Sequence, residues 1–196
     1  MYIRRIQQIS EDHCGPAVLQ MLLSQIGVFT TQQEITHLAE AEVTLHEDGV
    51  RIDQLALACR KVAPQAAFWY KHEATLEDIR YILQRGYGVG VEWQGLFYES
   101  EAEEEDDGDY GHYSIVSYID VERQALILVD PYKDFADQNR IFDIQVFMRR
   151  WWDENEVIDE YTNEKKLVKD SHTLFFVTPK TESFPTEMGF RQAFSF

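Results

Sequence analysis

The sequence has only two cysteines, Cys14 and Cys59, among its 196 residues. Two thiols cannot form a disulfide framework, and a reducing cytosol keeps them as free thiols. The chain also lacks any uncharged apolar run of about 18 residues, the length that a membrane-spanning helix needs. Its N-terminus reaches Glu11 before an apolar stretch forms, so it does not resemble a signal peptide. We therefore expect a cytoplasmic protein without membrane insertion.

Basic residues are scarce, with 18 lysines and arginines against 35 aspartates and glutamates and a formal net charge of −17. A field of this sign repels nucleic acids and anionic lipids and favours a basic peptide or partner. The histidines and cysteines show neither the C-x-x-C nor the H-E-x-x-H spacing of metal sites. We therefore expect no nucleic-acid partner, no metal and no other cofactor.

What is present is enough apolar material for a single core, at 44% of the residues. Apolar side chains recur at helical spacing in segments 14–26, 31–40, 49–62 and 75–86. After Gly86 the pattern changes to short β-rich runs at 89–93, 112–119, 125–130 and 173–178. A further helix opened by Asp143 carries Trp151 and Trp152. This order predicts an α+β fold, with an N-terminal helical half packed against a C-terminal antiparallel sheet.

Two segments stand apart from this pattern. We expect residues 1–178 to form one domain and residues 179–196 to be a C-terminal tail that wraps onto the domain or meets a partner. The acidic run ESEAEEEDDGD, at 99–109, has too little apolar content to fold by itself and is expected to be a mobile, solvated loop. The alternative hypothesis is that its carboxylates overhang a cleft, select a basic substrate segment and raise the pKa of His112.

Cys14 lies at the predicted start of the first helix, with Asp12 as the expected N-cap. Unpaired amides and the positive end of the helix dipole favour a thiolate there. Gly15 leaves room for a substrate carbonyl, and the amide of Cys14 can point at a developing oxyanion. The alternative is that Cys14 is only a small buried apolar residue. Cys59, on the apolar stripe of a later helix, is expected to be buried and inert.

The strands at 112–119 and 125–130 are separated by only a short connection, which predicts an antiparallel hairpin. If the turn centres on Val121, His112 lies directly opposite Asp130 with both side chains on one face. A shift of one residue would send them to opposite faces. In such a pair the carboxylate orients the imidazole, which takes a proton from a thiol. Taken alone, each residue has an ordinary structural explanation, as a strand histidine and as a turn former before Pro131.

Taken together, several segments resemble the bacteriocin-processing, double-glycine-leader cysteine peptidases and their stand-alone relatives. The matching segments are Gln8, DHCGPAVLQMLLSQIG from residue 12, GHYSIVSYID from residue 111 and LILVDPY from residue 126. The resemblance covers about residues 6–178 and implies a papain-like fold. It also implies Cys14 as nucleophile, His112 as base, Asp130 as orienting acid and Gln8 as a residue lining the oxyanion hole.

The resemblance implies a cysteine peptidase-like hydrolase that cuts a peptide or amide bond through an acyl-enzyme on Cys14. Its partner would be a peptide or protein substrate, with a basic segment as the hypothesis drawn from the acidic run. One alternative is an acyl- or peptidyl-transferase that uses the same triad, because only the acceptor differs. Another is a non-catalytic peptide-binding module, although relatives of that kind typically lose the cysteine that this chain retains.

Overall fold

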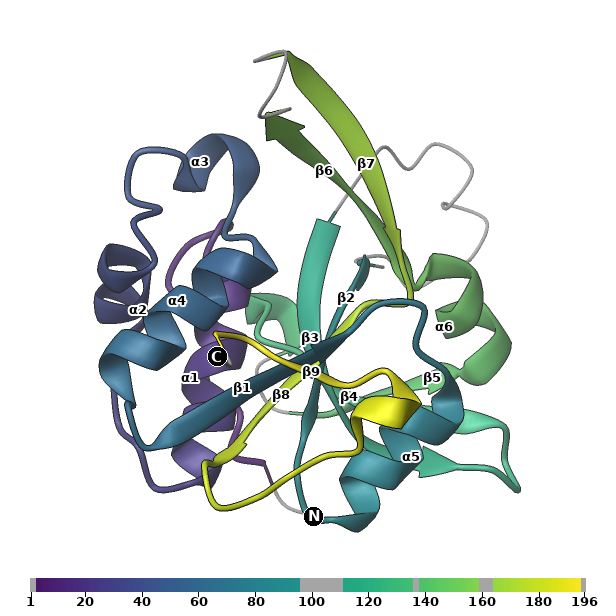
Figure 1. Cartoon of the computed structure of the whole chain (residues 1–196). Coiled ribbons are helices and arrows are strands. Elements are labelled where there is room, and N and C mark those ends of the chain that lie inside the picture. The colour runs from purple at the N-terminus through teal and green to yellow at the C-terminus, as the bar shows by residue number, and fades with distance from the viewer. Residues whose placement is uncertain (1–2, 96–110, 136–137, 159–163, 195–196) are drawn as a thin grey trace.

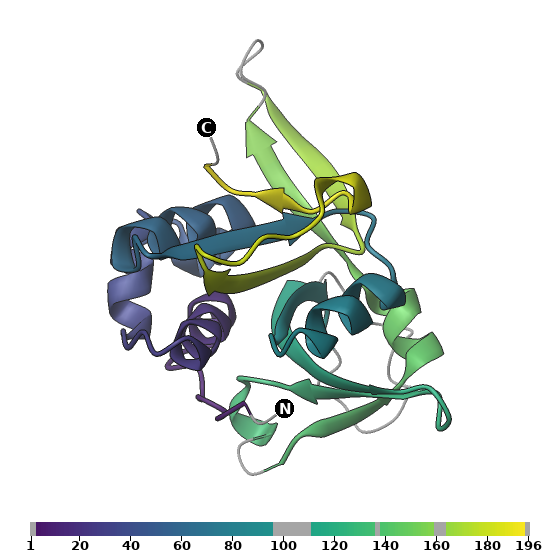
Figure 2. The ribbon, with the colours of Figure 1, turned by 60° about the horizontal axis from the view of Figure 1, so that its bottom comes forward.

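Helices from the first third of the chain stand on one side of a sheet (Figure 1). A computed structural model describes residues 3–95, 111–135, 138–158 and 164–194, and the acidic run at 99–109 lies outside these ranges. Within them the N-terminal helices are α1 (Cys14–Gln25), α2 (Gln32–Leu38), α3 (Leu45–Asp48) and α4 (Ile52–Val62). Helices α5 (Leu76–Gln84) and α6 (Ile144–Arg150) cover the other face of the sheet (Figure 2). The predicted helices are therefore confirmed, with α3 added.

The main sheet is antiparallel, with the strand order β5-β4-β3-β2-β8-β1-β9. Its strands are β1 (Ala66–Lys71), β2 (Val89–Gln94), β3 (Gly111–Asp120), β4 (Ala125–Val129), β5 (Arg140–Asp143), β8 (Leu174–Pro179) and β9 (Arg191–Gln192). Strands β6 (Trp152–Ile158) and β7 (Lys165–Ser171) form a separate hairpin that projects from the body of the molecule (Figure 1). Short 3₁₀ turns lie at Lys133–Phe135 and Thr186–Met188. The α+β prediction is confirmed, although β1 interrupts the expected helical half.

The sheet separates two parts of the core. The part between the sheet and the N-terminal helices includes Leu19, Leu22, Leu55 and Phe175. The part between the sheet and helices α5 and α6 includes Ile79, Ile82, Trp93, Phe147 and Phe176. Neighbouring residues of β8 supply one phenylalanine to each part, because successive side chains of a strand point to opposite faces. The ring of Phe175 fills the space in which a Cβ at Gly90 would lie, only 2.6 Å away.

Two predicted details at helix ends differ from the structure. The N-cap of α1 is His13, and Asp12 instead places Oδ2 2.7 Å from Nδ1 of His46, so the predicted capping role of Asp12 is wrong. Neither Trp151 nor Trp152 belongs to α6, which ends at Arg150, because Trp151 is its C-cap and Trp152 begins β6. The physical reason lies at Trp151, whose buried indole donates to the carbonyl of Thr173 at 2.9 Å and turns the chain onto the sheet.

The hairpin of β3 and β4 forms, but its predicted register is wrong. Asp120 pairs with Ala125 and Ile115 with Val129, so the turn does not centre on Val121. A β-bulge lies at Ser117, between Val116 and Tyr118. The extra residue turns every side chain upstream of it to the other face. Upstream of the bulge, on the His112 side, the strand pairing is shifted by two residues from the predicted pairing. Because this shift is even, each side chain keeps its predicted face.

The segment after Pro179 packs on the domain. Phe184 and Phe190 are buried, at 4% and 1% exposure, and β9 pairs with β1 at the edge of the sheet. The guanidinium of Arg60 lies 3.9 Å from the ring centre of Phe194. This segment was expected either to wrap onto the domain or to meet a partner, and its residues up to 194 wrap onto the domain.

Candidate active site

His112 and Asp130 form a buried pair at the end of the β3–β4 hairpin. Nε2 of the imidazole lies 3.0 Å from Oδ1 of the carboxylate, and the two side chains are 4% and 0% exposed. Since the observed register brings Ser114 beside Asp130, the imidazole reaches the carboxylate from two residues further along the same face of β3. The structure thus brings together two of the predicted site residues.

The other oxygen of Asp130 is held by two donors. Ser114 Oγ donates to Oδ2 at 3.2 Å and Arg140 donates to it at 2.8 Å, while the amide of Tyr132 donates to Oδ1 at 2.9 Å. Burial by itself would raise the pKa of Asp130, but His112, Arg140 and the amide hold it well below its usual range. The carboxylate is therefore fixed in position and kept ionised.

Ser114 and Arg140 are not among the predicted site residues. Ser114 could have been predicted, because it lies two residues from His112 and so shares its face in any regular strand. Arg140 could not have been predicted, since it comes from β5, a four-residue edge strand without a recognisable sequence pattern. Its guanidinium lies 3.6 Å from the ring centre of Phe135 and 4.6 Å from that of Phe142.

Aromatic rings close the carboxylate end of the site. Trp93, fully buried, donates Nε1 to Ser114 Oγ at 3.1 Å, and its ring centre is 6.5 Å from that of His112. The hydrogen bonds therefore run from Trp93 through Ser114 and Asp130 to His112. Such a chain is electrostatically stronger in a dry, low-dielectric environment than in water.

Cys14 meets the other side of the imidazole. It is the first residue of α1 and is 9% exposed, and its side chain interacts with that of His112. Burial lowers the pKa of His112, but the Asp130 carboxylate and the interaction with Cys14 outweigh it and raise that pKa to about 10. Because Nε2 faces Asp130, Nδ1 is the ring nitrogen left for the thiol. The three residues form a connected acid–base arrangement with a charged imidazolium at neutral pH.

The chain before Cys14 is tied to the chain after Asp130. The amide of Gln8 donates to the carbonyl of Pro131 at 2.9 Å, and Arg5 donates to the carbonyls of Asp130 and Tyr132. Nearer the helix, an ion pair of 2.7 Å joins Lys133 and Glu11. These contacts hold the start of α1 against the end of β4, which is why Cys14 and Asp130 share one site.

Gln8 is buried, at 6% exposure, beside the loop that precedes Cys14. Its side-chain amide donates to the carbonyls of Ser10 and Glu11 at 2.8 and 2.9 Å. Within the described ranges its Oε1 is a buried acceptor without a hydrogen-bond partner. In this conformation Gln8 fixes the loop, and a role as oxyanion donor requires one of these bonds to be exchanged.

Gly15 has a packing reason that the sequence did not reveal. A Cβ at this position would lie 3.2 Å from the ring of Tyr113, which covers the start of α1. The hydroxyl of Tyr113 donates to Oε1 of Glu92 at 2.5 Å. Burial raises the pKa of Glu92 to about 7, although the bond from Tyr113 opposes the shift. Besides the ionised Asp130, a carboxyl group that is partly protonated at neutral pH therefore lies near Cys14.

A cavity of about 380 Å³ opens beside Cys14, within the size range of small-molecule pockets, about 300–1,000 Å³. The helical side contributes the loop before α1 and the segment from α3 to the start of α4, including Glu47 and Arg51. The sheet side contributes Glu92, and the β6–β7 hairpin contributes Glu154. A substrate that reaches the sulfur of Cys14 through this cavity meets an acidic lining.

Three further expectations concern Cys59, metal binding and membrane-spanning helices. Cys59 is 1% exposed, and burial raises the pKa of its thiol to about 12, which fits an inert residue. The described residues contain no group of three or more His, Cys, Asp or Glu side chains arranged to hold a metal ion. Among the described helices, none combines the length and the apolar character needed to cross a membrane.

Comparison with known proteins identifies relatives of this chain. Residues 1–157 match the family model described as the Peptidase C39 like family. The peptidase domain of Streptococcus ComA, a bi-functional ABC transporter involved in a quorum-sensing pathway, is similar with a TM-score of 0.59 and 17% identity, over 91% of this chain and 100% of that domain. Comparison with curated proteins gives no match.

Two further solved structures share the fold. A C39-like peptidase from Bacillus anthracis has a TM-score of 0.58 and 16% identity, over 90% of this chain and 94% of its own. A double glycine motif protease from an AMS/PCAT transporter, solved in complex with the leader peptide, has a TM-score of 0.56 and 13% identity, over 91% and 93%. These similarities confirm the predicted papain-like fold and the resemblance drawn from the sequence.

Proposed function

Since this chain belongs to the Peptidase C39-like family, we propose that it is a cysteine peptidase that cuts a peptide bond through an acyl-enzyme on Cys14. One observation carries the proposal, namely that Cys14 interacts with the imidazole of His112, which is itself 3.0 Å from the buried carboxylate of Asp130. Each residue alone has an ordinary structural explanation. Their connection at the start of a helix, beside a cavity, supports a shared chemical role.

In the proposed reaction the sulfur of Cys14 attacks the substrate carbonyl carbon, and the imidazolium of His112 gives its proton to the leaving amine. Water then attacks the thioester while His112 accepts a proton from it. The C–S bond breaks, the acid product leaves, and the sulfur of Cys14 returns as a thiolate beside the imidazolium of His112. Asp130 keeps Nε2 of His112 oriented and stabilises the imidazolium form each time His112 carries the proton.

The oxyanion of the tetrahedral intermediate needs donors in the correct place. We assign this role to the backbone amide of Cys14, at the start of α1, and to the side-chain amide of Gln8 after one of its loop bonds is exchanged. The substrate is a peptide or protein, supported by the related protease that was solved with its leader peptide. A cytosolic location remains part of the proposal.

A thiol-directed peptide ketone probe tests the proposal. Cys14→Ala should abolish labelling, and His112→Ala should slow it strongly because the sulfur loses its base. Cys59→Ala should label like the wild type, since that thiol is buried, and His37→Ala serves as an exposed histidine control. Labelling that survives Cys14→Ala defeats the proposal.

A peptide library with mass-spectrometric detection then identifies the reaction. Hydrolysis yields free carboxylates at the cut site. Addition of amine acceptors separates this outcome from acyl transfer, because a transferase joins the acyl group to the amine. No cleavage and no transfer, with folded protein and a labelled Cys14, would contradict the assignment as a peptidase.

A further inference from the structure

The cavity beside Cys14 has a strongly one-sided charge. Six acidic side chains line it, with a single arginine, and they are Glu11, Asp12, Glu47, Glu92, Asp153 and Glu154, of which Glu92 is partly protonated at neutral pH. The arginine, Arg51, holds Asp53 through two bonds, from Nε at 3.0 Å and from an NH2 group at 2.8 Å. Its charge is therefore compensated locally by a carboxylate outside the set of six.

Four of the six carboxylates have partners of their own. Glu11 pairs with Lys133, Asp12 with His46, Glu92 accepts from Tyr113 and Asp153 accepts from Gln94 at 3.0 Å. Within the described parts of the chain, the side chains of Glu47 and Glu154 take part in no hydrogen bond or ion pair. These two carboxylates are therefore the ones best able to receive a cation from a substrate.

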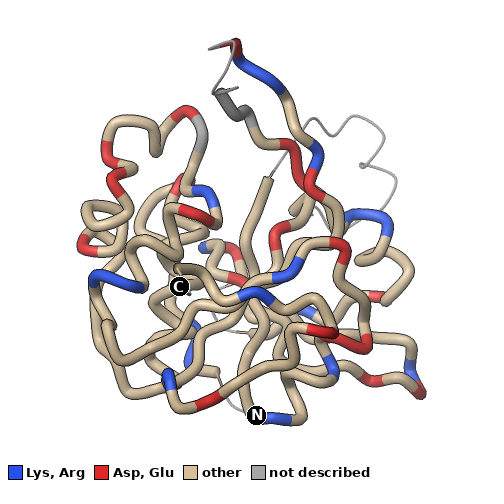
Figure 3. The backbone as a smooth tube through the Cα atoms, viewed as in Figure 1, with Lys and Arg blue, Asp and Glu red and all other residues tan. Residues whose placement is uncertain are grey.

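Glu47 and Glu154 face the cavity from different halves of the molecule. Glu47 belongs to α3 on the helical side, and Glu154 belongs to β6 in the projecting hairpin. Figure 3 shows acidic positions around α3 and along the β6–β7 hairpin, where lysines lie among them. A cationic group that enters between the two halves would meet a carboxylate on each side.

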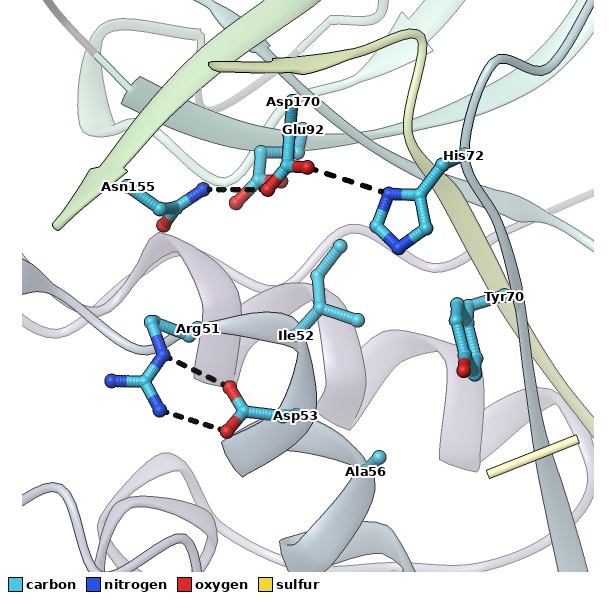
Figure 4. A pocket seen from close by; sticks show the side chains of 9 residues that line it. All are labelled: Arg51, Ile52, Asp53, Ala56, Tyr70, His72, Glu92, Asn155 and Asp170. Carbon is cyan, nitrogen blue, oxygen red and sulfur yellow. Dashed lines mark hydrogen bonds and ion pairs between the residues drawn. The ribbon is translucent and has the colours of Figure 1, made fainter. Parts of the chain in front are cut away.

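A second cavity, of about 360 Å³, continues from the first because the two share Arg51, Glu92 and Asn155. Figure 4 shows its walls, with α4 on one side and Glu92, Asn155 and Asp170 on the other. Ile52, Ala56 and Tyr70 give it an apolar part. Apolar walls next to carboxylates suit a side chain with an aliphatic stem and a charged head, which describes lysine and arginine.

We propose that the cavity beside Cys14 binds a lysine or arginine side chain of the peptide substrate, and that Glu47 and Glu154 receive its cationic head. This inference rests on the proposed peptidase function and names its substrate class. It depends on residues in the described helices and strands and not on the acidic run at 99–109. Electrostatic complementarity of this kind sets which peptides bind and how fast they arrive.

Peptide binding to the Cys14→Ala protein tests the inference without catalysis. The probes are fluorescent hexapeptides in which one lysine, or one norleucine of similar length, moves along a glycine–alanine background, read by anisotropy. At one or two positions lysine should bind roughly threefold to tenfold more tightly, as expected for one or two partly exposed charge pairs. Rising salt should remove the difference, because the screening length falls to about 3 Å at 1 M.

Substitutions assign the preference to the cavity. Glu47→Gln and Glu154→Gln should each reduce the ratio of lysine to norleucine affinity, and the double variant should abolish it. Glu122→Gln, an equal change of charge in the exposed β3–β4 turn, should leave the ratio unchanged. Equal affinity at every position, including absence of binding by both peptides, overturns the inference. Failure of the proposed function is detected separately, as absence of His112-dependent labelling of Cys14 in the wild type.

Discussion

Arg140 donates to Oδ2 of Asp130 at 2.8 Å, while Oδ1 is left to His112. Both partners are deeply buried, with the arginine side chain 9% exposed and the carboxylate fully covered. The carboxylate therefore lies between two cations, one from β5 and one from β3. Removal of the carboxylate would leave both of them without its charge in a low-dielectric environment.

Asp130→Asn should therefore destabilise the protein by about 3–5 kcal/mol, the usual result of leaving a buried charge without its counter-ion. Urea unfolding at neutral pH measures this change. Asp120→Asn is the matched control, because its pair with Arg123 is largely exposed and 3.7 Å long, and it should cost less than about 1 kcal/mol. Similar small losses for both variants would contradict the description of Asp130 as a buried ion-pair centre.

The stability of the protein should depend on pH through His112. Its pKa is about 10 in the folded protein, against an ordinary value of 6.5. A raised pKa means that the imidazolium contributes stability that is fully present below about pH 6.5 and is lost as the pH rises through 10. The difference in unfolding free energy between the wild type and His112→Gln should therefore shrink over this interval. A difference that grows with pH would show that the imidazole is not stabilised in its charged form, and His37→Gln reports the pH dependence of an exposed histidine.

Gly111→Ala should disturb the site from its edge. Gly111 directly precedes His112 in the chain, and a Cβ at Gly111 would lie 2.5 Å from Oδ1 of Asp153. Overpacking of this kind costs about 1–3 kcal/mol. The melting temperature and the rate of probe labelling of Cys14 should both fall. A second substitution, Asp153→Ala, should restore part of the stability because it removes the clashing oxygen. Without such rescue, the loss at Gly111 would have another cause.

Gln8→Ala separates the two roles of Gln8. Loss of its bonds to Ser10 and Glu11 should cost about 0.5–1.5 kcal/mol each in unfolding free energy. Loss of an oxyanion donor would lower the rate of acyl transfer by about 10²–10³-fold. A variant that is destabilised but reacts at the normal rate would assign Gln8 to the loop alone, and a slow but stable variant would assign it to the oxyanion.

Much of this site could be predicted from local patterns. Cys14 at a helix start and His112 near Asp130 follow from helical spacing and from a short connection between two strands. The register was wrong, yet the bulge at Ser117 left an even shift, so the two side chains kept a common face. The agreement therefore depends on a feature that periodicity alone does not reveal.

Other parts of the site depend on contacts between distant segments. Arg140 comes from a short edge strand, and the docking of the chain at Gln8 on Pro131 joins two segments with no shared pattern. The β6–β7 hairpin, which supplies Glu154, alternates charged residues without a clear apolar face. Tertiary packing determines these placements, and a single sequence gives no direct measure of it.

The docking of the N-terminal segment on the end of β4 also has a consequence for the order of events during synthesis. Arg5 and Asp130 are 125 residues apart in the chain, and the N-terminal part of a nascent protein emerges first. Cys14 therefore leaves the ribosome long before His112 and Asp130 are made. Since contacts so distant in sequence form late, a newly made chain carries its thiol through most of translation without an acid–base partner.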